Sequence, residues 1–388
     1  MNSITKLFIF LLISFFILSY SFSKEIQKTE NQTFKEAVRG VWLTNVDSEA
    51  LFTKEKLIEA VNLCDEIGIN AIYVVVWNKA MTLYPSKIMK EFTGIEIDTN
   101  VKKGFDPLKT LIEEARKKGI KVIAWFEFGF SSSYQQNGGI LLQKKPHWKA
   151  IDNEGKLVVK NGFEWMNGFH PEVQDFIISL ILEVITNYDV DGIQGDDRLP
   201  AMPCESGYDE YTISLYEKEF GKKPPEDKYD KEWIKWRADI LNNFMKRIYN
   251  EVKNVKPDLI VSMAPSIYPW SLEEYLQDWP TWVKNGNVDL LCPQVYRYEF
   301  DNYKESLDEI LKNQLPENYK IKFSPGILLK VGNYYPSEEY LLQMIEENRR
   351  NGIYGESFFF FEGLKKFKEL FKTKIYPEKF SFPKEIKK

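Results

Sequence analysis

Short runs of apolar, β-branched and aromatic residues recur along the chain and alternate with segments of helical periodicity. The runs span residues 39–47, 70–77, 120–129, 190–197, 259–265, 288–296, 321–327 and 356–362. They are apolar at nearly every position rather than at alternate positions. This pattern predicts strands buried on both faces, as in a parallel sheet.

Segments with apolar residues three or four positions apart fill the gaps between these runs. They span residues 54–67, 108–118, 171–188, 233–255, 306–311 and 337–350. Gly68, Gly119 and Gly352 follow three of them, as expected where helices end. The strand–helix alternation predicts an α/β fold, a (β/α)8 TIM barrel that forms a single catalytic domain over residues 37–370.

A doubly wound open sheet is the alternative α/β architecture. If such a sheet bound a dinucleotide, a glycine-rich phosphate loop would normally follow the first strand. Asn45, Val46 and Asp47 stand at that point instead, so the barrel is favoured.

The two ends of the chain differ from the barrel region. Lys6, an apolar run over residues 7–18 and the small residues Ser21 and Ser23 predict a signal peptide over residues 1–23. We expect a linker over 24–36 and a polar C-terminal tail over 371–388. The protein is then secreted or periplasmic, with no stable membrane span after cleavage. The alternative is a membrane tether through an uncleaved signal, for which the apolar run is short.

Charge and residue counts exclude several function classes. The 388 residues include 52 basic and 57 acidic side chains, a net charge of -5, which gives no support to nucleic-acid binding. Only two histidines occur, His147 and His170, which argues against a histidine-based zinc site, and no GxSxG motif accompanies them. The three cysteines are far apart and odd in number, so they indicate no disulfide framework. We expect no metal and no cofactor, and nothing in the sequence indicates an oligomeric state.

Acidic and aromatic residues gather where the predicted strands end, which is where active sites of such barrels lie. The acidic candidates are Asp47, Glu127, Asp196, Asp197, Glu299 and Glu362. The aromatic candidates for stacking on sugars are Trp77, Trp125, Trp165, Trp270 and Tyr296. Glycoside cleavage needs two carboxyl groups, one protonated and one ionised, on either side of the bond. The ring of residues therefore favours sugar chemistry.

Asp196 and Asp197 directly end the fourth run. Side chains alternate along a strand, so Asp196 shares a face with Gln194 and is expected to point into the barrel mouth. Asp197 then points outward or belongs to the loop. The positive charge of Arg198 can lower the pKa of either aspartate, which suits a nucleophile or a base. The simpler alternative is a helix cap or a solvated pair of loop residues.

Several motifs occur in an order that resembles the glycosyl-hydrolase-like 10 family, from about residue 39 to residue 364. They are 39–44 (RGVWLT), 124–129 (AWFEFG), 169–173 (FHPEV), 191–197 (DGIQGDD), 293–298 (PQVYRY) and 357–362 (SFFFFE). The resemblance implies a TIM-like barrel, export and glycoside hydrolysis. Some members of the family are implicated in cleaving peptidoglycan glycan strands that lack stem peptides. The chain departs from the family at Gly195, where a bulky aromatic residue is usual.

The fourth-strand motif also resembles the Asp-Gly-x-x-x-Asp motif of α-amylases and α-galactosidases. That resemblance implies that Asp196 is the nucleophile and that Glu299, after the sixth strand, is the acid/base. The expected catalytic residues are Asp196, Glu299, Glu127 and Asp197. The expected substrate-binding residues are Asn45, Trp77, Trp125, Gln194, Arg198, Gln294, Tyr296, Arg297 and Glu362.

The leading hypothesis is a glycoside hydrolase acting on an extracellular or cell-wall glycan, possibly the glycan strands of peptidoglycan. Asp196 would be the nucleophile or base, and a second carboxylate the general acid. The alternatives are a carbohydrate-binding barrel without catalysis, a transglycosylase and, from another class, a metal-dependent hydrolase that uses only Asp and Glu.

Overall fold

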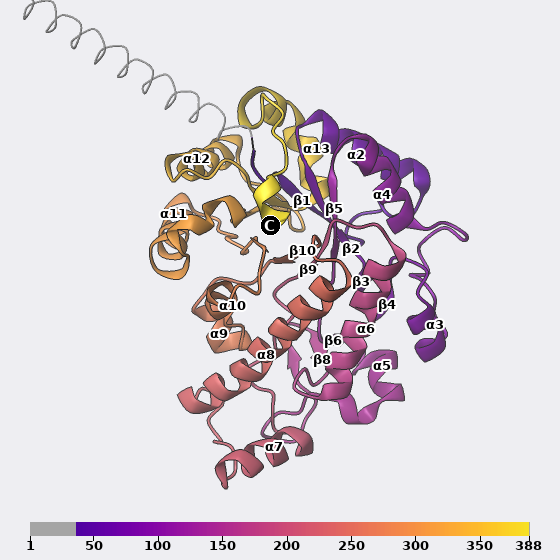
Figure 1. The fold of residues 1–388 in the computed structure, drawn as a ribbon, viewed down its shortest axis with the longest axis vertical. Helices are drawn as coiled ribbons and strands as arrows, with labels where there is room; N and C mark the ends of the chain where they lie inside the picture. The colour runs from indigo at the N-terminus through magenta and orange to yellow at the C-terminus, as the bar shows by residue number, and fades with distance from the viewer. Residues whose placement is uncertain (1–35, 388) are drawn as a thin grey trace, which may run out of the picture.

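The structure, a computed structural model, describes residues 36–387 and is built around eight parallel strands. Each strand falls on one of the eight apolar runs. The strands are β1 (Gly40–Leu43), β2 (Ala71–Val75), β5 (Lys121–Trp125), β9 (Gly192–Gly195), β10 (Ile260–Met263), β11 (Leu290–Leu291), β12 (Gly326–Leu328) and β13 (Ser357–Phe359). Figure 1 shows them at the centre of the molecule, with helices around them.

The sheet curls and closes on itself. Its strand order is β11-β10-β9-β5-β2-β1-β13-β12, and every neighbouring pair is parallel. The two outer strands are joined by backbone bonds from Ser324 to Leu291 at 2.9 Å and from Gly326 to Pro293 at 2.8 Å. The predicted (β/α)8 barrel is therefore confirmed.

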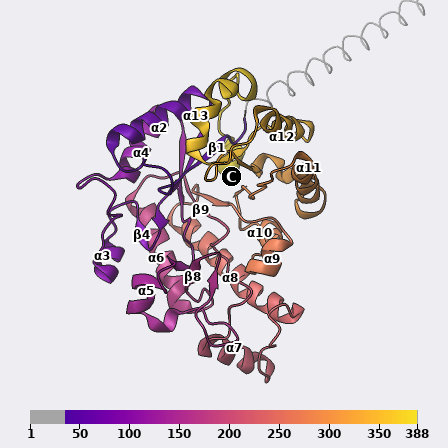
Figure 2. The ribbon, with the colours of Figure 1, turned by 180° about the vertical axis from the view of Figure 1, so that it is seen from behind.

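Helices surround the barrel on its outer side, as the view from behind in Figure 2 also shows. They are α2 (Lys54–Glu66), α3 (Lys87–Thr93), α4 (Pro107–Lys117), α5 (Gly139–Lys144), α6 (Pro171–Asn187), α7 (Glu210–Phe220), α8 (Lys231–Val255), α9 (Trp270–Tyr275), α10 (Trp279–Lys284), α11 (Phe300–Glu309), α12 (Glu338–Arg350) and α13 (Phe361–Leu370). Local chemistry sets their ends. In α4, for example, the Asp106 side chain accepts a hydrogen bond from the Lys109 backbone and Pro107 begins the helix.

The barrel interior is filled with large side chains. Trp42 and Tyr73 pack with ring centroids 5.3 Å apart, and Tyr73 also hydrogen-bonds Cys292. Gly40 faces the same space, since a Cβ there would lie 2.4 Å from the Tyr73 ring. The interior is thus a packed core rather than a pore, and function is confined to the mouth.

Short elements between β2 and α6 build up the wall of the mouth. They are the hairpin β3 (Trp77–Asn78) with β4 (Met81–Thr82), and a three-stranded sheet of β6 (Ser131–Tyr134), β8 (Phe163–Trp165) and β7 (Val159–Lys160). None of these short strands lies within an uninterrupted apolar run of its own, so the hydrophobic pattern did not predict them.

The C-terminal segment was expected to be a polar tail beyond residue 370, but it packs onto the amino end of the barrel. The guanidinium of Arg39 lies between the rings of Tyr376 and Phe380, 3.9 Å from each centroid. Ala37 donates a backbone hydrogen bond to Ser381 at 3.1 Å. Because its aromatic residues are spaced among lysines, the segment is amphipathic and closes the bottom of the barrel.

The predicted signal peptide over residues 1–23, and the linker over 24–36 except Glu36, lie outside the described residues. Within residues 36–387, no helix has both the length and the apolar character required to cross a membrane.

Candidate active site

Asp196 follows β9 directly, at the carboxyl-end mouth of the barrel, and only 2% of it is exposed. Both of its oxygens accept hydrogen bonds. The Arg198 backbone N–H donates to Oδ1 at 3.0 Å, and the Trp125 indole N–H donates to Oδ2 at 3.1 Å. The Gln277 amide holds the Asp196 carbonyl at 2.7 Å. The aspartate is therefore fixed from several sides.

The turn that aims Asp196 depends on the glycine before it. A Cβ at Gly195 would lie 2.3 Å from the carbonyl oxygen of Leu199. No side chain fits there, so the bulky aromatic residue usual at this position in the family could not be accommodated in this chain.

Glu127 follows β5, the neighbour of β9 in the sheet, and 13% of its side chain is exposed. Its Oε2 accepts hydrogen bonds from the Thr44 hydroxyl at 3.1 Å and the Asn78 amide at 3.0 Å. Its Oε1 lies 3.7 Å from Nη2 of Arg198. Within residues 36–387, this second oxygen accepts no hydrogen bond.

Arg198 joins three carboxylates. Its Nη2 lies 3.4 Å from Asp196 Oδ2 and 3.7 Å from Glu127 Oε1, and its Nη1 lies 3.4 Å from Asp197 Oδ1. Its guanidinium also lies over the ring of Phe163, 4.7 Å from the centroid. Because one nitrogen contacts both Asp196 and Glu127, these two carboxyl groups are close neighbours across the mouth.

Burial dominates the electrostatics of this cluster. It raises the pKa of Asp196 well above its usual value, and the Arg198 charge opposes that shift without cancelling it. Burial likewise raises the pKa of Glu127, again against Arg198. The expectation of a lowered pKa for Asp196 was therefore wrong, because the cost of desolvating the carboxylate exceeds the attraction of the guanidinium.

Gln194 lies below Asp196 inside the barrel and is 0% exposed. Its oxygen accepts from the Trp42 indole at 2.7 Å, and its nitrogen donates to the Ser262 hydroxyl at 2.8 Å. In this structure the residue supports the floor of the site through these two hydrogen bonds.

Of the four tryptophans predicted to stack on sugars, Trp270 is exposed, whereas Trp77, Trp125 and Trp165 lie in the core. Trp77 is 0% exposed and packs edge-on against Phe128 and Phe176, so neither face of its ring is open to a sugar. Trp125 is buried as well, and its contribution to the site is the hydrogen bond to Asp196.

Asn45 belongs to a polar relay that ends at Glu127. Its side-chain oxygen accepts from Asn78 at 2.8 Å, and its nitrogen donates to Asp98 at 2.8 Å. Since Asn78 also donates to Glu127, the relay fixes the position of that carboxyl group.

Tyr296 reaches the cluster from the segment after β11. Burial raises the pKa of its phenol well above the usual value, and the negative charges of Asp197 and Asp196 add to the shift. Its ring packs on Phe359, with centroids 5.5 Å apart. Gln294, two residues earlier, donates to the Ala264 carbonyl at 3.1 Å.

The next two predicted residues point elsewhere. Arg297 donates to the carbonyl of its neighbour Tyr296 at 2.8 Å. Glu299 is exposed and precedes α11. Among residues 36–387, no hydrogen bond or ion pair joins the Glu299 carboxylate to Asp196 or Glu127.

Glu362 lies in the first turn of α13 and lines a cavity of about 640 Å³. The Ser48 hydroxyl donates to it at 2.8 Å, and Lys365 pairs with it at 3.2 Å. Asn45 lines the same cavity. The structure thus brings these two predicted binding residues to one hollow beside the relay to Glu127.

Sequence reasoning missed Thr44, Asn78 and Gln277, which hold the carboxylates in place. Thr44 lies near the end of the first apolar run and Asn78 directly follows the second, so their position was a usable signal. Gln277 comes from the segment between α9 and α10, and no local pattern connects it to Asp196.

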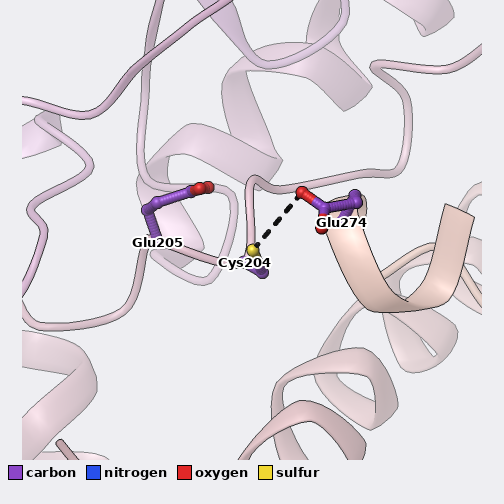
Figure 3. A group of neighbouring side chains, drawn as sticks. All are labelled: Cys204, Glu205 and Glu274. Carbon is purple, nitrogen blue, oxygen red and sulfur yellow. Dashed lines mark hydrogen bonds between the residues drawn. The ribbon is translucent and has the colours of Figure 1, made fainter. Parts of the chain in front are cut away.

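One further group has the composition of a metal site. Ligand atoms of Cys204, Glu205 and Glu274 lie within 4.8 Å of one another, with the Cys204 thiol facing Glu274 (Figure 3). The Lys160 ammonium, however, lies 3.1 Å from Glu205 and 2.7 Å from Glu274, and Lys228 contacts Glu205 at 2.6 Å. These lysines supply the positive charge, so the group is an ion-pair network that joins the wall of the mouth.

Solved structures of glycoside hydrolases are similar to this chain in fold. One is the PgaB (BpsB) glycoside hydrolase domain from Bordetella bronchiseptica, with a TM-score of 0.64 and 14% identity over 86% of this chain and 97% of that one. Another is the catalytic domain of beta-amylase from Paenibacillus polymyxa, with a TM-score of 0.55 and 11% identity over 90% and 99% of the two chains.

The chain belongs to the glycosyl hydrolase-like 10 family, whose sequence profile matches residues 37–329. This confirms the resemblance in the motifs. Glycosyl hydrolase DigH of Escherichia coli (strain K12) is 24% identical over 303 residues, 68% of this chain and 66% of DigH. Glycosyl hydrolase YngK of Bacillus subtilis (strain 168) is 25% identical over 329 residues, 76% of this chain and 60% of YngK. The matches cover less than two thirds of the length of these relatives.

Proposed function

We propose that the chain is a glycoside hydrolase of extracellular or cell-wall glycans, with Asp196 as nucleophile or base and Glu127 as general acid. The observation that carries the proposal is the shared contact of both carboxyl groups with Arg198. Two neighbouring carboxyl groups at a barrel mouth are what cleavage of a glycosidic bond requires.

Hydrogen bonds separate the two roles. Both oxygens of Asp196 accept bonds from N–H groups, and such bonds favour the charged form. Oε1 of Glu127 lies free of such donors within the described chain, so it is the oxygen that can carry a proton. In the cleavage step, Glu127 gives that proton to the glycosidic oxygen as the bond breaks. Asp196 attacks the anomeric carbon or takes a proton from the attacking water.

The remaining residues are assigned supporting roles. Asp197 and Tyr296 line the mouth beside the reacting sugar, and Arg198 tunes the charge of the carboxylates. Glu299, at the rim, is not the acid in this proposal. The cavity lined by Asn45 and Glu362 takes a neighbouring part of the glycan.

The substrate proposal rests on two further points. A signal peptide over residues 1–23, as the sequence predicts, would place the protein outside the cytoplasm, where cell-wall glycans are met. The family resemblance makes peptidoglycan glycan strands without stem peptides the first substrate to test.

A carbohydrate-binding barrel without catalysis is the second candidate. It is favoured by the small exposure of Asp196, 2%, because a nucleophile must touch the sugar. Transglycosylation uses the same carboxylates and differs only in whether a sugar replaces water as acceptor.

The test is release of reducing ends from stripped peptidoglycan strands and from α- and β-linked polysaccharides. We expect Asp196→Asn and Glu127→Gln each to lower turnover by about 10²–10⁴-fold, while Glu346→Gln, on the outer surface, leaves it unchanged. Normal turnover in Asp196→Asn would contradict its role. Binding without release from any glycan would favour the non-catalytic barrel.

A further inference from the structure

Two tyrosines from neighbouring loops meet on the surface at the carboxyl end of the barrel. Tyr298 follows β11 and is 62% exposed, the largest value among the exposed large apolar side chains of the described chain. Tyr334 follows β12, and its ring meets that of Tyr298 edge-on, with centroids 4.8 Å apart. The two rings therefore form one exposed aromatic pair.

The exposure of Tyr298 does not come from a loose loop. The Tyr340 hydroxyl is bonded to the carbonyls on both sides of it, Arg297 at 2.8 Å and Glu299 at 3.2 Å. Tyr334 closes a tight turn through two backbone bonds with Val331, at 2.8 and 3.3 Å. Both backbones are held in place, so the ring of Tyr298 is presented in a fixed orientation at little cost in entropy.

Through Tyr298, the pair is close along the chain to Tyr296 of the proposed catalytic cluster. Tyr296 stands two residues before Tyr298. Burial raises the pKa of the Tyr296 phenol, and the negative charges of Asp197 and Asp196 raise it further. A chain of sugars that passes Tyr296 on leaving the carboxylates therefore meets Tyr298 next along the wall.

We propose that the ring of Tyr298, held edge-on by Tyr334, is a stacking surface for a sugar unit away from the bond that is cleaved. The ligand class is a polymeric glycan, and the inference rests on the proposed function. The size of the feature favours a sugar over a protein partner. A stable protein interface buries roughly 800 Å² on each side, whereas this surface is one aromatic pair with Val331 as an exposed apolar neighbour.

The experiment measures binding in an Asp196→Asn background, so that no glycan is consumed. The probes are peptidoglycan glycan strands stripped of stem peptides and the disaccharide unit of the same strands. We expect Tyr298→Ala to weaken binding of the long strands about tenfold, which corresponds to about 1.4 kcal/mol. The effect on the disaccharide should be much smaller. Tyr298→Phe should restore strand binding, because stacking uses the ring and not the hydroxyl.

Phe220→Ala is the matched control, since Phe220 is an exposed aromatic residue at the end of α7. Equal strand binding by Tyr298→Ala and its parent would overturn the proposal. So would an equal loss in Phe220→Ala, or no strand binding by the parent. Strand binding that depends on Tyr298, without release of reducing ends by the wild type, would reject the hydrolase and keep the stacking surface. Release of reducing ends by the wild type, together with strand binding that does not depend on Tyr298, would reject the stacking surface and keep the hydrolase.

Discussion

The mouth and the bottom of the barrel each bury an arginine beside carboxylates, but the two clusters are balanced differently. At the bottom, Glu356 accepts hydrogen bonds from Asn348 at 3.0 Å, from Tyr376 at 2.7 Å and from both terminal nitrogens of Arg349. Arg39 also contributes positive charge there. At the mouth, one guanidinium faces three carboxylates.

This difference indicates that the bottom cluster contributes to stability, whereas the mouth cluster has the charge balance of a candidate reaction site. Both oxygens of Glu356 at the bottom accept hydrogen bonds, and Tyr376 and Phe380 of the C-terminal segment pack on the neighbouring Arg39. At the mouth, burial raises the pKa of Asp196 and Glu127, and the neighbouring carboxylates add to the shift against the Arg198 charge, as expected of a candidate proton-transfer site. The same residue types thus stabilise one end of the barrel and form the candidate reaction site at the other.

Breaking the lower cluster should give the largest effect. Glu356→Ala leaves the half-buried Arg349 and the buried Asn348 without their acceptor, so we expect the free energy of unfolding to fall by about 3 kcal/mol, as measured by urea denaturation. Glu346→Ala, which removes an exposed pair with Arg350, should change it by less than about 0.5 kcal/mol. Glycan turnover per folded molecule should be kept in both variants. A loss of turnover without loss of stability in Glu356→Ala would contradict the comparison.

At the mouth, the ionisation of Asp196 should make the free energy of unfolding depend on pH. The pKa of Asp196 is higher in the folded than in the unfolded protein. Its contribution to stability is therefore complete below its unfolded pKa of about 3.9 and is lost as pH rises through the folded pKa. Relative to Asp196→Asn, the wild type should lose stability between acid and neutral pH, by about 1.4 kcal/mol for each unit by which the folded pKa exceeds the unfolded one. Thermal unfolding over this range tests it, and a difference that does not vary with pH would refute it.

The smallest expected effect concerns the pH profile of turnover. Arg198 lowers the pKa of both Asp196 and Glu127 against their burial. Arg198→Met removes this contribution, so the base ionises only at higher pH and the acidic limb of the kcat/KM profile moves upward. Arg350→Met, at an exposed position, is the control. A shift of the acidic limb to lower pH in Arg198→Met would contradict the prediction that Arg198 lowers the pKa of these carboxyl groups.

The fold could be predicted because buried parallel strands leave a strong signal. All eight strands fall on apolar runs, even β11, which has only two residues. The packing of residues 371–387 could not be predicted in the same way. Its aromatic residues are separated by lysines, and Arg39, which they enclose, lies more than 330 positions earlier, as the bond from Arg39 to Glu378 shows.

The sequence predicted those site residues that directly follow a strand, but not those whose position depends on the length and path of a loop. Alternation placed Gln194 inside the barrel with Asp196 above it, and Glu127 lies at the end of the neighbouring strand. Trp77 was expected at the surface, but Phe176 from α6 covers it. Glu299 was expected to act on the substrate, but the segment after β11 carries it to the rim. Loop length and helix placement, which set both outcomes, are not encoded in local periodicity.

The side chain of Arg198 already supplies a positive charge to the carboxylates of the mouth. Its guanidinium lies among three carboxylates and over the Phe163 ring, beside the two carboxyl groups that we propose act on the sugar. A group tethered to the same chain competes as an intramolecular ligand, at an effective concentration of roughly millimolar or above. A positively charged sugar mimic must displace this arginine before it can pair with Asp196, so a neutral glycan that leaves the ion pairs in place enters the mouth more readily.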